Sequence, residues 1–312
     1  LHLSLRRQRQ MCIRDREYCL QLGQYRRVVC RGLCSFGIEK TAQVNYFNYV
    51  TRPLLRRMFA KGLLGRPPRA PADVPRFRVL VLGIYLTDRV NQASQLVVDF
   101  AKSQQHDVDQ KWVALGATPP TSDPGLKAVT VRHCRQLIPK FKLLNEMLAG
   151  LEVDDYDYII FTDDDVALCP DFVDAYLAWV ASCGFSISQP ARTRFSYRDH
   201  KFCLRTWGVK ARETLFVEIG PVFVFDRAAA RHLLPFDERS PMGWGIDFVW
   251  PKKTRELNMT MGIIDAVTVD HSYREQGKTY SSSDNRIIMD EFLRDVEHLK
   301  PEEARVSIRI YR

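Results

Sequence analysis

Three adjacent aspartates, Asp163, Asp164 and Asp165, directly follow the apolar segment YIIFT at residues 158–162. Such a segment is typical of a buried strand, and ligands of open α/β sheets bind at the carboxyl ends of strands. Because side chains two positions apart in an extended chain point the same way, Asp163 and Asp165 can face one site while Asp164 points elsewhere. The three carboxylates repel one another, so a cation bound among them would be stabilising. Their hard oxygen atoms favour Mg²⁺ or Mn²⁺ as that cation. A solvated acidic turn is the structural alternative.

Two later segments carry further groups that suit catalysis. In MGWGID at residues 242–247, the two glycines indicate unusual backbone angles or backbone held close to a ligand, and Trp244 can stack on a sugar ring or a base. Asp247 stands at a predicted helix start, where it can cap the helix, act as general base for a hydroxyl, or do both. His271 ends a predicted strand and is a candidate third metal ligand, with a hydrogen-bonded structural role as the alternative.

These side chains need a scaffold, and the sequence predicts one from residue 76 onward. Predicted strands and helices alternate, which is typical of a doubly wound α/β sheet with right-handed crossovers. We expect strands over residues 76–86, 111–115, 128–131, 158–162, 185–188, 215–225 and 261–269. We expect helices after Asn91, Pro139 and Asp171 and over residues 226–234 and 284–299. Pro251 is expected to shorten or kink the helix that follows Asp247.

The first quarter of the chain differs from the rest. Residues 1–72 hold 15 basic and 3 acidic residues, so their net charge of +12 exceeds the +9 of the whole chain. Residues 1–16 resemble translated sequencing-adapter DNA and are interpreted as non-biological, with a genuine basic tail as the alternative. Residues 17–64 are predicted to be a basic helical extension, either packed on the domain or in peripheral contact with an anionic membrane. Residues 65–75 contain four prolines and form a predicted linker to a catalytic domain over 76–312.

The composition excludes several classes of protein. At 46% hydrophobic residues the chain is too apolar for a disordered protein, and no apolar stretch reaches the ~18 residues that a transmembrane helix needs. Eight scattered cysteines without a Cys-x-x-Cys pair argue against a zinc knuckle and favour buried thiols, hence a cytoplasmic protein that is at most membrane-peripheral. Because the positive charge is confined to the N-terminal quarter, we do not expect nucleic acid as a partner.

The order of the motifs is more specific than any one of them. A strand followed by Asp-x-Asp, a later Gly-Trp-Gly-x-Asp and a final strand-end His occur in this order in nucleotide-sugar glycosyltransferases of the GT-A fold. More closely, the chain resembles a poorly characterised glycosyltransferase-like family that is common in plant genomes and also found in bacteria. The matching segments are SQPA at 188–191, FVEIGPVF at 216–223, GWGIDF at 243–248 and GIIDAVTVDH at 262–271.

This resemblance implies a GT-A-like mixed sheet with flanking helices and a metal-dependent glycosyltransferase activity. The sugar would pass from a nucleotide-diphosphate donor to a hydroxyl of a glycan or other acceptor. By the same resemblance, Asp163 and Asp165 would hold Mn²⁺ or Mg²⁺ on the diphosphate, and His271 would complete the metal ligands or touch the diphosphate. Asp247 would take the proton from the acceptor, which implies inversion at the anomeric carbon. Glu218 is a candidate for acceptor binding or for a second base, with a strand salt bridge as the alternative.

Further substrate contacts are expected from residues near these groups: Asp164, Lys140, Gln189, Gly243, Trp244 and Gly245. Lys140 could reach a phosphate as a point charge, or it could be a solvated residue of a first helical turn. Two other functions stay open. Nucleotidyl transfer is less favoured because the segment after the first strand, residues 83–89, holds one glycine where a Gly-rich basic loop is usual. A non-catalytic GT-A-like scaffold that binds a sugar is the other.

Overall fold

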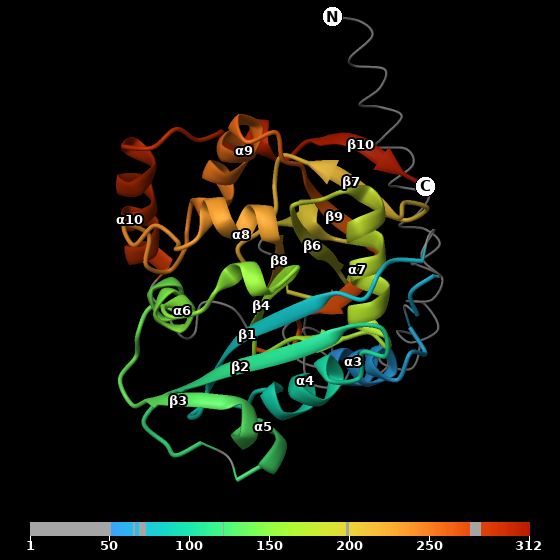
Figure 1. Cartoon of the computed structure of the whole chain (residues 1–312), viewed down its shortest axis with the longest axis vertical. Helices are drawn as coiled ribbons and strands as arrows, with labels where there is room; N and C mark the ends of the chain where they lie inside the picture. The colour runs from blue at the N-terminus through green and yellow to red at the C-terminus, as the bar shows by residue number, and fades with distance from the viewer. Residues whose placement is uncertain (1–50, 65, 69–72, 121, 198–199, 275–281) are drawn as a thin grey trace, which may run out of the picture. The chain divides into compact units, whose positions relative to one another are not determined.

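The computed structural model of the chain describes residues 51–64, 66–68, 73–120, 122–197, 200–274 and 282–312 (Figure 1). The chain divides into two units, Leu1–Arg52 and Pro53–Arg312, and the second contains all the predicted site residues. The predictions for residues 1–16, and those for 17–50, 65 and 69–72, lie outside the described residues. A helix, α3 (Arg52–Ala60), lies in the described end of the predicted basic extension.

The described strands form one mixed sheet. They are β1 (Arg78–Leu86), β2 (Asp107–Leu115), β3 (Thr130–Cys134), β4 (Tyr158–Asp163), β5 (Ala167–Leu168), β6 (Ile187–Arg192), β7 (Ala211–Thr214), β8 (Val222–Asp226), β9 (Met261–Asp270) and β10 (Ser307–Tyr311). Their order is β10-β7-β9-β6-β8-β4-β1-β2-β3, and β5 pairs with β9. The strands β3, β2, β1 and β4 are mutually parallel, whereas β8 runs antiparallel to β4 and β6. The predicted doubly wound mixed sheet is therefore confirmed.

Helices cover both faces of this sheet. They are α4 (Ala93–Phe100), α5 (Pro124–Val129), α6 (Lys140–Leu148), α7 (Phe172–Cys183), α8 (Arg227–Leu233), α9 (Ile246–Glu256), α10 (Ser282–Arg294) and α11 (Pro301–Ala304). Side chains of β1 alternate between the faces, as the two-residue period of a strand requires. Val79 and Val81 belong to the core under α4 and α7, and Leu80 and Leu82 to the core under α6, α8, α9 and α10. The sheet is thus buried on both sides, which explains why its strands are continuously apolar.

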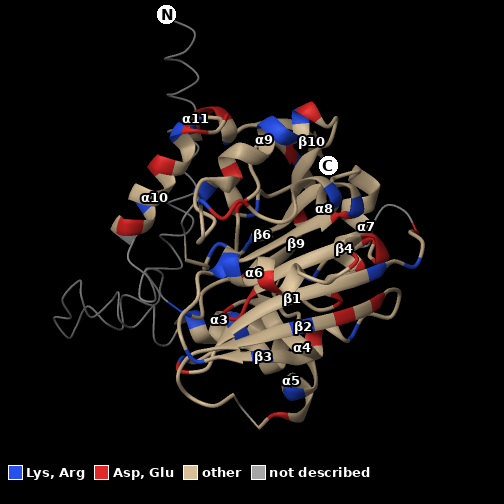
Figure 2. Ribbon diagram, turned by 60° about the vertical axis from the view of Figure 1, so that its left-hand side comes forward, with Lys and Arg blue, Asp and Glu red and all other residues tan. Residues whose placement is uncertain are grey.

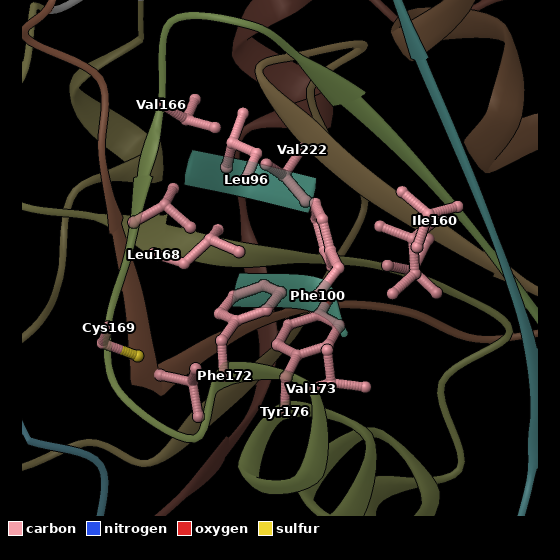
Figure 3. Close-up of a cluster of buried hydrophobic side chains, with 14 of the residues drawn as sticks. Leu96, Phe100, Ile160, Val166, Leu168, Cys169, Phe172, Val173, Tyr176 and Val222 are labelled. Carbon is pink, nitrogen blue, oxygen red and sulfur yellow. The ribbon is translucent and has the colours of Figure 1, made fainter. Parts of the chain in front are cut away.

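The core under α4 and α7 shows how the helices are fixed (Figure 3). Leu96 and Phe100 of α4 meet Phe172 and Tyr176 of α7 above Ile160 of β4, which lies at the centre of the sheet. All five side chains are at most 2% exposed. Complete burial of such a side chain stabilises a protein by about 1.5–3 kcal/mol. The strand β4, which ends at the acidic residues, is therefore held rigidly from this face.

Two sequence predictions about secondary structure are wrong. Of the strand expected over residues 215–225, only residues 222–225 are strand, as part of β8, and residues 215–221 are not; β7, over Ala211–Thr214, precedes the expected range. Pro221 has no N–H for a sheet ladder, and the N–H of Glu218 is bound by the Gln189 side chain instead of a neighbouring strand. Pro251 does not shorten the helix after Asp247, because α9 continues through it to Glu256. Because Pro251 has no N–H, the helix loses only the backbone hydrogen bond that residue 251 would donate to the Asp247 carbonyl. The later turns of α9 keep their hydrogen bonds and still form.

Other features of the described part of the chain agree with its composition. None of its helices is long and apolar enough to cross a membrane, and peripheral contact through residues 17–64 stays a prediction. Cys134, Cys169 and Cys203 are buried free thiols, and Cys183 is a half-buried one.

Candidate active site

The three aspartates lie where β4 ends, beside the end of the parallel strand β1. The Leu86 N–H donates to Asp164 Oδ2 at 2.7 Å, and the Gln92 N–H donates to the Asp164 carbonyl oxygen at 2.6 Å. The Asp164 side chain is only 2% exposed. These two bonds tie the acidic turn to the end of β1 and to the chain that follows it.

Basic side chains face the acidic turn from α6 and from the segment that follows β9. Lys140 Nζ of α6 lies 2.6 Å from Asp163 Oδ1, and His271 Nε2 at the end of β9 lies 3.2 Å from Asp165 Oδ1. Arg274 forms an ion pair with Asp164, and its Nε lies 3.2 Å from Asp165 Oδ2. Adjacent carboxylates can be buried together only if their charge is compensated, and these side chains supply the compensation.

The charges of this cluster shift one another's pKa values. Burial raises the pKa of Asp164, and this outweighs the opposing effect of Arg274. Burial also acts to raise the pKa of Asp165, but His271 and Arg274 overcome it and hold that pKa well below its usual range. Burial lowers the pKa of His271, and the adjacent Asp165 more than reverses this, so that the pKa of His271 is raised. Asp165 is therefore an ionised carboxylate at neutral pH.

Asp247 lies in the first turn of α9, after a glycine that makes this turn possible. Gly245 is the N-cap residue and has φ +92°, in the left-handed region where glycine is favoured. Asp247 is 4% exposed, and within the described residues its Oδ1 has no hydrogen-bond partner. Burial raises the pKa of Asp247 to about 8, and the nearby Glu218 contributes to the shift. The sequence predicted a cap or a base here; the structure places the cap at Gly245.

Glu218 lies in the segment between β7 and β8 and is held from β6. Arg192 Nη2 lies 2.6 Å from Glu218 Oε1, and the Gln189 side-chain oxygen accepts a hydrogen bond from the Glu218 N–H at 2.5 Å. The side chains of Arg192 and Glu218 are 2% and 6% exposed. The salt bridge weighed for Glu218 from the sequence is therefore present, with its partner at the end of β6.

A cavity of about 1500 Å³ collects most of the predicted residues. It is lined by Lys140, Asp163, Asp164, Asp165, Glu218, Trp244, Gly245, Asp247 and His271. Gln189 and Gly243 are not among its lining residues. Gln189 lies beneath Glu218, and Gly243, with φ +82°, is packed so closely on Phe141 that a Cβ there would lie 2.3 Å from the ring.

The donor atoms at the acidic turn suit a hard divalent ion, although the cations described above hold them in this structure. In the described part of the chain, no group of three or more His, Cys, Asp or Glu side chains could hold a metal ion as it stands. Asp163, Asp165 and His271 nevertheless face one cavity, and carboxylate oxygen with imidazole nitrogen is a donor set that Mn²⁺ accepts. The donor atoms of these three residues are therefore of the type that Mn²⁺ or Mg²⁺ binds.

Sequence reasoning missed six basic residues of the cavity: Arg89, Arg192, His200, Arg274, Arg286 and Arg305. Arg274 could have been found from the sequence, because it lies three positions after His271, a predicted site residue. Arg192 directly follows the segment SQPA. Nothing in the sequence near Arg305 indicates a site, because this residue reaches the cavity only through the packing of α11 against α9.

Known proteins were compared with the chain at the levels of sequence and structure. No family model matches it, and no curated protein sequence matches it. Among solved structures, the mannosyltransferase PcManGT from Pyrobaculum calidifontis, in complex with GDP-Man and Mn²⁺, matches with a TM-score of 0.51 at 15% identity. The match covers 84% of this chain and 77% of that one. The fold is that of the GT-A glycosyltransferases.

Two further structures match with lower TM-scores. GalNAc-T7 with UDP, GalNAc and Mn²⁺ has a TM-score of 0.46 at 10% identity, over 66% of this chain and 45% of that one. The chain thus spans less than half of the length of GalNAc-T7. S. aureus TarS 1–349 with UDP-GlcNAc has a TM-score of 0.46 at 12% identity, over 72% and 69% of the two chains. The expected GT-A fold is confirmed, and the closer resemblance to the plant and bacterial family stays a prediction.

Proposed function

We propose that the chain is a GT-A glycosyltransferase that transfers a sugar from a nucleoside-diphosphate donor to an acceptor hydroxyl with inversion. The observation that carries this proposal is that the acidic turn and the buried Asp247 line one cavity on this fold. In the proposal, Asp163, Asp165 and His271 hold Mn²⁺ or Mg²⁺. When bound, the ion neutralises charge on the departing nucleoside diphosphate.

The residues around the acidic turn bind and orient the donor in this proposal. Lys140, now beside Asp163, contacts a phosphate oxygen as a point charge. Asp164 keeps the turn in place through its bond from the Leu86 N–H. Trp244 and Gly245, which line the same cavity, contact the transferred sugar or the acceptor in this proposal.

Asp247 is the proposed general base. The acceptor oxygen bonds to the anomeric carbon, its proton passes to Asp247, and the bond to the diphosphate oxygen breaks with its electron pair on the leaving group. A base with a pKa near the working pH is suited to this role, and the pKa of Asp247 is about 8. Glu218 is less available as a base because Arg192 holds its carboxylate, so we assign it to acceptor binding. Gln189 and Gly243 act indirectly, by positioning Glu218 and the loop that leads to Asp247.

The test is incubation of the chain with UDP- and GDP-sugars, with Mn²⁺ or with EDTA. We expect Mn²⁺-dependent release of nucleoside diphosphate. Asp163→Asn and Asp165→Asn should lose Mn²⁺-dependent donor binding, whereas Asp154→Asn, at an exposed salt bridge outside the cavity, should retain it. If the two turn variants bind metal and donor as the parent does, their metal role is wrong. Release of pyrophosphate would favour nucleotidyl transfer, and the absence of any donor-dependent thermal shift would favour a non-catalytic scaffold.

A further inference from the structure

The cavity wall near Asp247 carries a positive charge that the described residues do not compensate. Arg192 lines this wall but is paired with Glu218 at 2.6 Å. Arg305, which follows α11, also lines the wall and forms no ion pair with any described residue. Arg286 and Asp290, four positions apart on α10, also line the cavity and carry opposite formal charges. Arg305 is therefore a positive charge on this wall that no ion pair among the described residues neutralises.

Arg305 is held in place by aromatic rings and by its backbone. Its guanidinium carbon lies 5.6 Å from the ring centroid of Phe216 and 5.8 Å from that of Phe248. The Leu299 N–H donates to the Phe248 carbonyl at 2.9 Å, and the Arg305 N–H donates to the Pro301 carbonyl at 3.2 Å. A guanidinium over an aromatic face keeps its N–H edge available for a ligand.

The charge of Arg305 acts on the groups around the proposed base. Arg305 lowers the pKa of Asp247, against the larger effect of burial. Burial, then Arg305 and Arg192, lower the pKa of His200 to about 4. His200 is therefore neutral at pH 7. The carboxylates of the acidic turn are instead paired with Lys140 and Arg274, whereas Arg305 lies beside Phe216 and Phe248.

We propose that Arg305 binds an anionic group of the acceptor, so that the acceptor is a sugar carrying a carboxylate or a phosphate near the accepting hydroxyl. This inference rests on the proposed function for the meaning of "acceptor", but the anion site itself can be measured without turnover. A single charge-assisted hydrogen bond at an exposed arginine is sufficient to distinguish an acidic sugar from its neutral counterpart. We expect a preference of about tenfold.

The experiment is calorimetric titration of the full chain with methyl glucoside, methyl glucuronide and methyl glucoside 6-phosphate. At least one anionic sugar should bind about tenfold more tightly than the neutral one, and comparison of the two anions identifies the carboxylate or the phosphate as the ligand. Arg305→Gln should remove the preference and leave binding of the neutral sugar unchanged, and Arg305→Lys should restore part of it. The matched control is Arg309→Gln, since Arg309 also lies over an aromatic ring, that of Tyr311, but does not line the cavity.

Equal binding of the neutral and anionic sugars by the parent would overturn the inference. So would an equal loss for all three sugars in Arg305→Gln, because that result indicates a structural role over the aromatic rings. The proposed function fails separately: an Arg305-dependent preference without nucleoside-diphosphate release from any donor supports the anion site and contradicts the transferase. Release of nucleoside diphosphate with no preference for anionic sugars contradicts only this inference.

Discussion

Asp247 shows how one buried carboxyl group can relate stability to chemistry. Removing a carboxylate from water disfavours its charged form, and Asp247 has Glu218 nearby and an oxygen without a hydrogen-bond partner among the described residues. A carboxyl group in such a position lowers the stability of the folded chain at neutral pH, because the group ionises readily in the unfolded chain but not where it is buried. A base that must accept a proton during each turnover benefits from the same environment.

The pH dependence of the reaction tests this role. A general base must be unprotonated, so kcat/KM should rise with pH through the pKa of Asp247, which is about 8 without donor and metal. Asp247→Asn should lower kcat by roughly 10²–10⁴-fold and leave the dissociation constant of the donor unchanged. Glu218→Gln should weaken acceptor binding without removing the pH dependence. A rising pH limb that persists in Asp247→Asn would contradict the assignment.

The stability of Asp247→Asn gives an independent measurement. The pKa of Asp247 is higher in the folded chain, about 8, than its ordinary value of 3.8, so between these pH values the folded state binds more protons. The contribution of this group to stability therefore falls as pH rises from about 4 to about 8. Asn does not titrate, so Asp247→Asn should gain stability relative to the parent across that window, by at most about 1.4 kcal/mol per pH unit. Urea unfolding at pH 5 and pH 8 measures this; a constant difference would show that the pKa is not raised.

At the scale of elements, the loop before α9 positions the base through two glycines. Gly243 has φ +82° and approaches the Phe141 ring, and Gly245 has φ +92° and approaches Met289 of α10. The pattern Gly-Trp-Gly therefore reflects close packing on α6 and α10 as well as access to the cavity. Trp244 between them lines the cavity.

Substitution of Gly243 tests two requirements at that position: the left-handed backbone angle and the lack of space for a Cβ beside the Phe141 ring. Gly243→Ala should destabilise the chain both through the left-handed angle and through a Cβ placed 2.3 Å from the Phe141 ring. Gly150→Ala is the matched control, since Gly150 has φ +80° but nothing within 4 Å of the added Cβ. We expect about 1–2 kcal/mol for the control and about 1–3 kcal/mol more for Gly243→Ala. Equal losses in chemical denaturation would show that the contact with Phe141 relaxes at no cost.

A buried ion pair joins β7 to β9. Arg212 Nε lies 2.8 Å from Asp265 Oδ2, and the Thr206 N–H donates to Asp265 Oδ1 at 2.7 Å. Arg212→Met should cost about 3–5 kcal/mol because it leaves a buried carboxylate without its cation. The double variant with Asp265→Asn should recover part of this loss. Full additivity of the two substitutions in denaturant unfolding would mean that the pair is not energetically coupled.

At the scale of the whole molecule, the net charge is a poor guide to function. The chain carries +9, but residues 73–312 carry −3, and acidic and basic residues alternate along α10 in the view of Figure 2. Charge that matters for the proposed reaction is local: cations at the acidic turn and an arginine near Asp247. The overall sign describes mainly residues 1–72.

Ligand binding should stabilise the full chain. A ligand that binds only the folded state raises its stability by about 2.7 kcal/mol at 100 times its dissociation constant. We therefore expect a nucleoside diphosphate with Mn²⁺ to raise Tm in a concentration-dependent manner. EDTA should abolish the shift, and Asp165→Asn should reduce it. A shift of equal size with EDTA would show that the nucleotide binds without the metal.

Local patterns determined much of the fold. The apolar runs of β1 and β4, the helical spacing after Pro139 and the position of the acidic turn were predicted because each depends on neighbouring residues only. The non-strand segment over residues 215–221 was not predicted, because the N–H of Glu218 bonds to a side chain 29 residues away. The order of the motifs also indicated the GT-A fold before any contact was known.

The grouping and the electrostatics of the candidate site residues depend on the tertiary structure. Arg192, Glu218, Asp247 and Arg305 are far apart in the chain, and packing of β6, α9 and α11 brings them to one cavity. The raised pKa of Asp247 and the ion pairs of the acidic turn follow from burial and from distances between segments. A sequence records which groups are present, but electrostatic energy depends on separation and on exclusion of water. For this reason the acidic turn could be read from the sequence, while the basic side of the cavity could not.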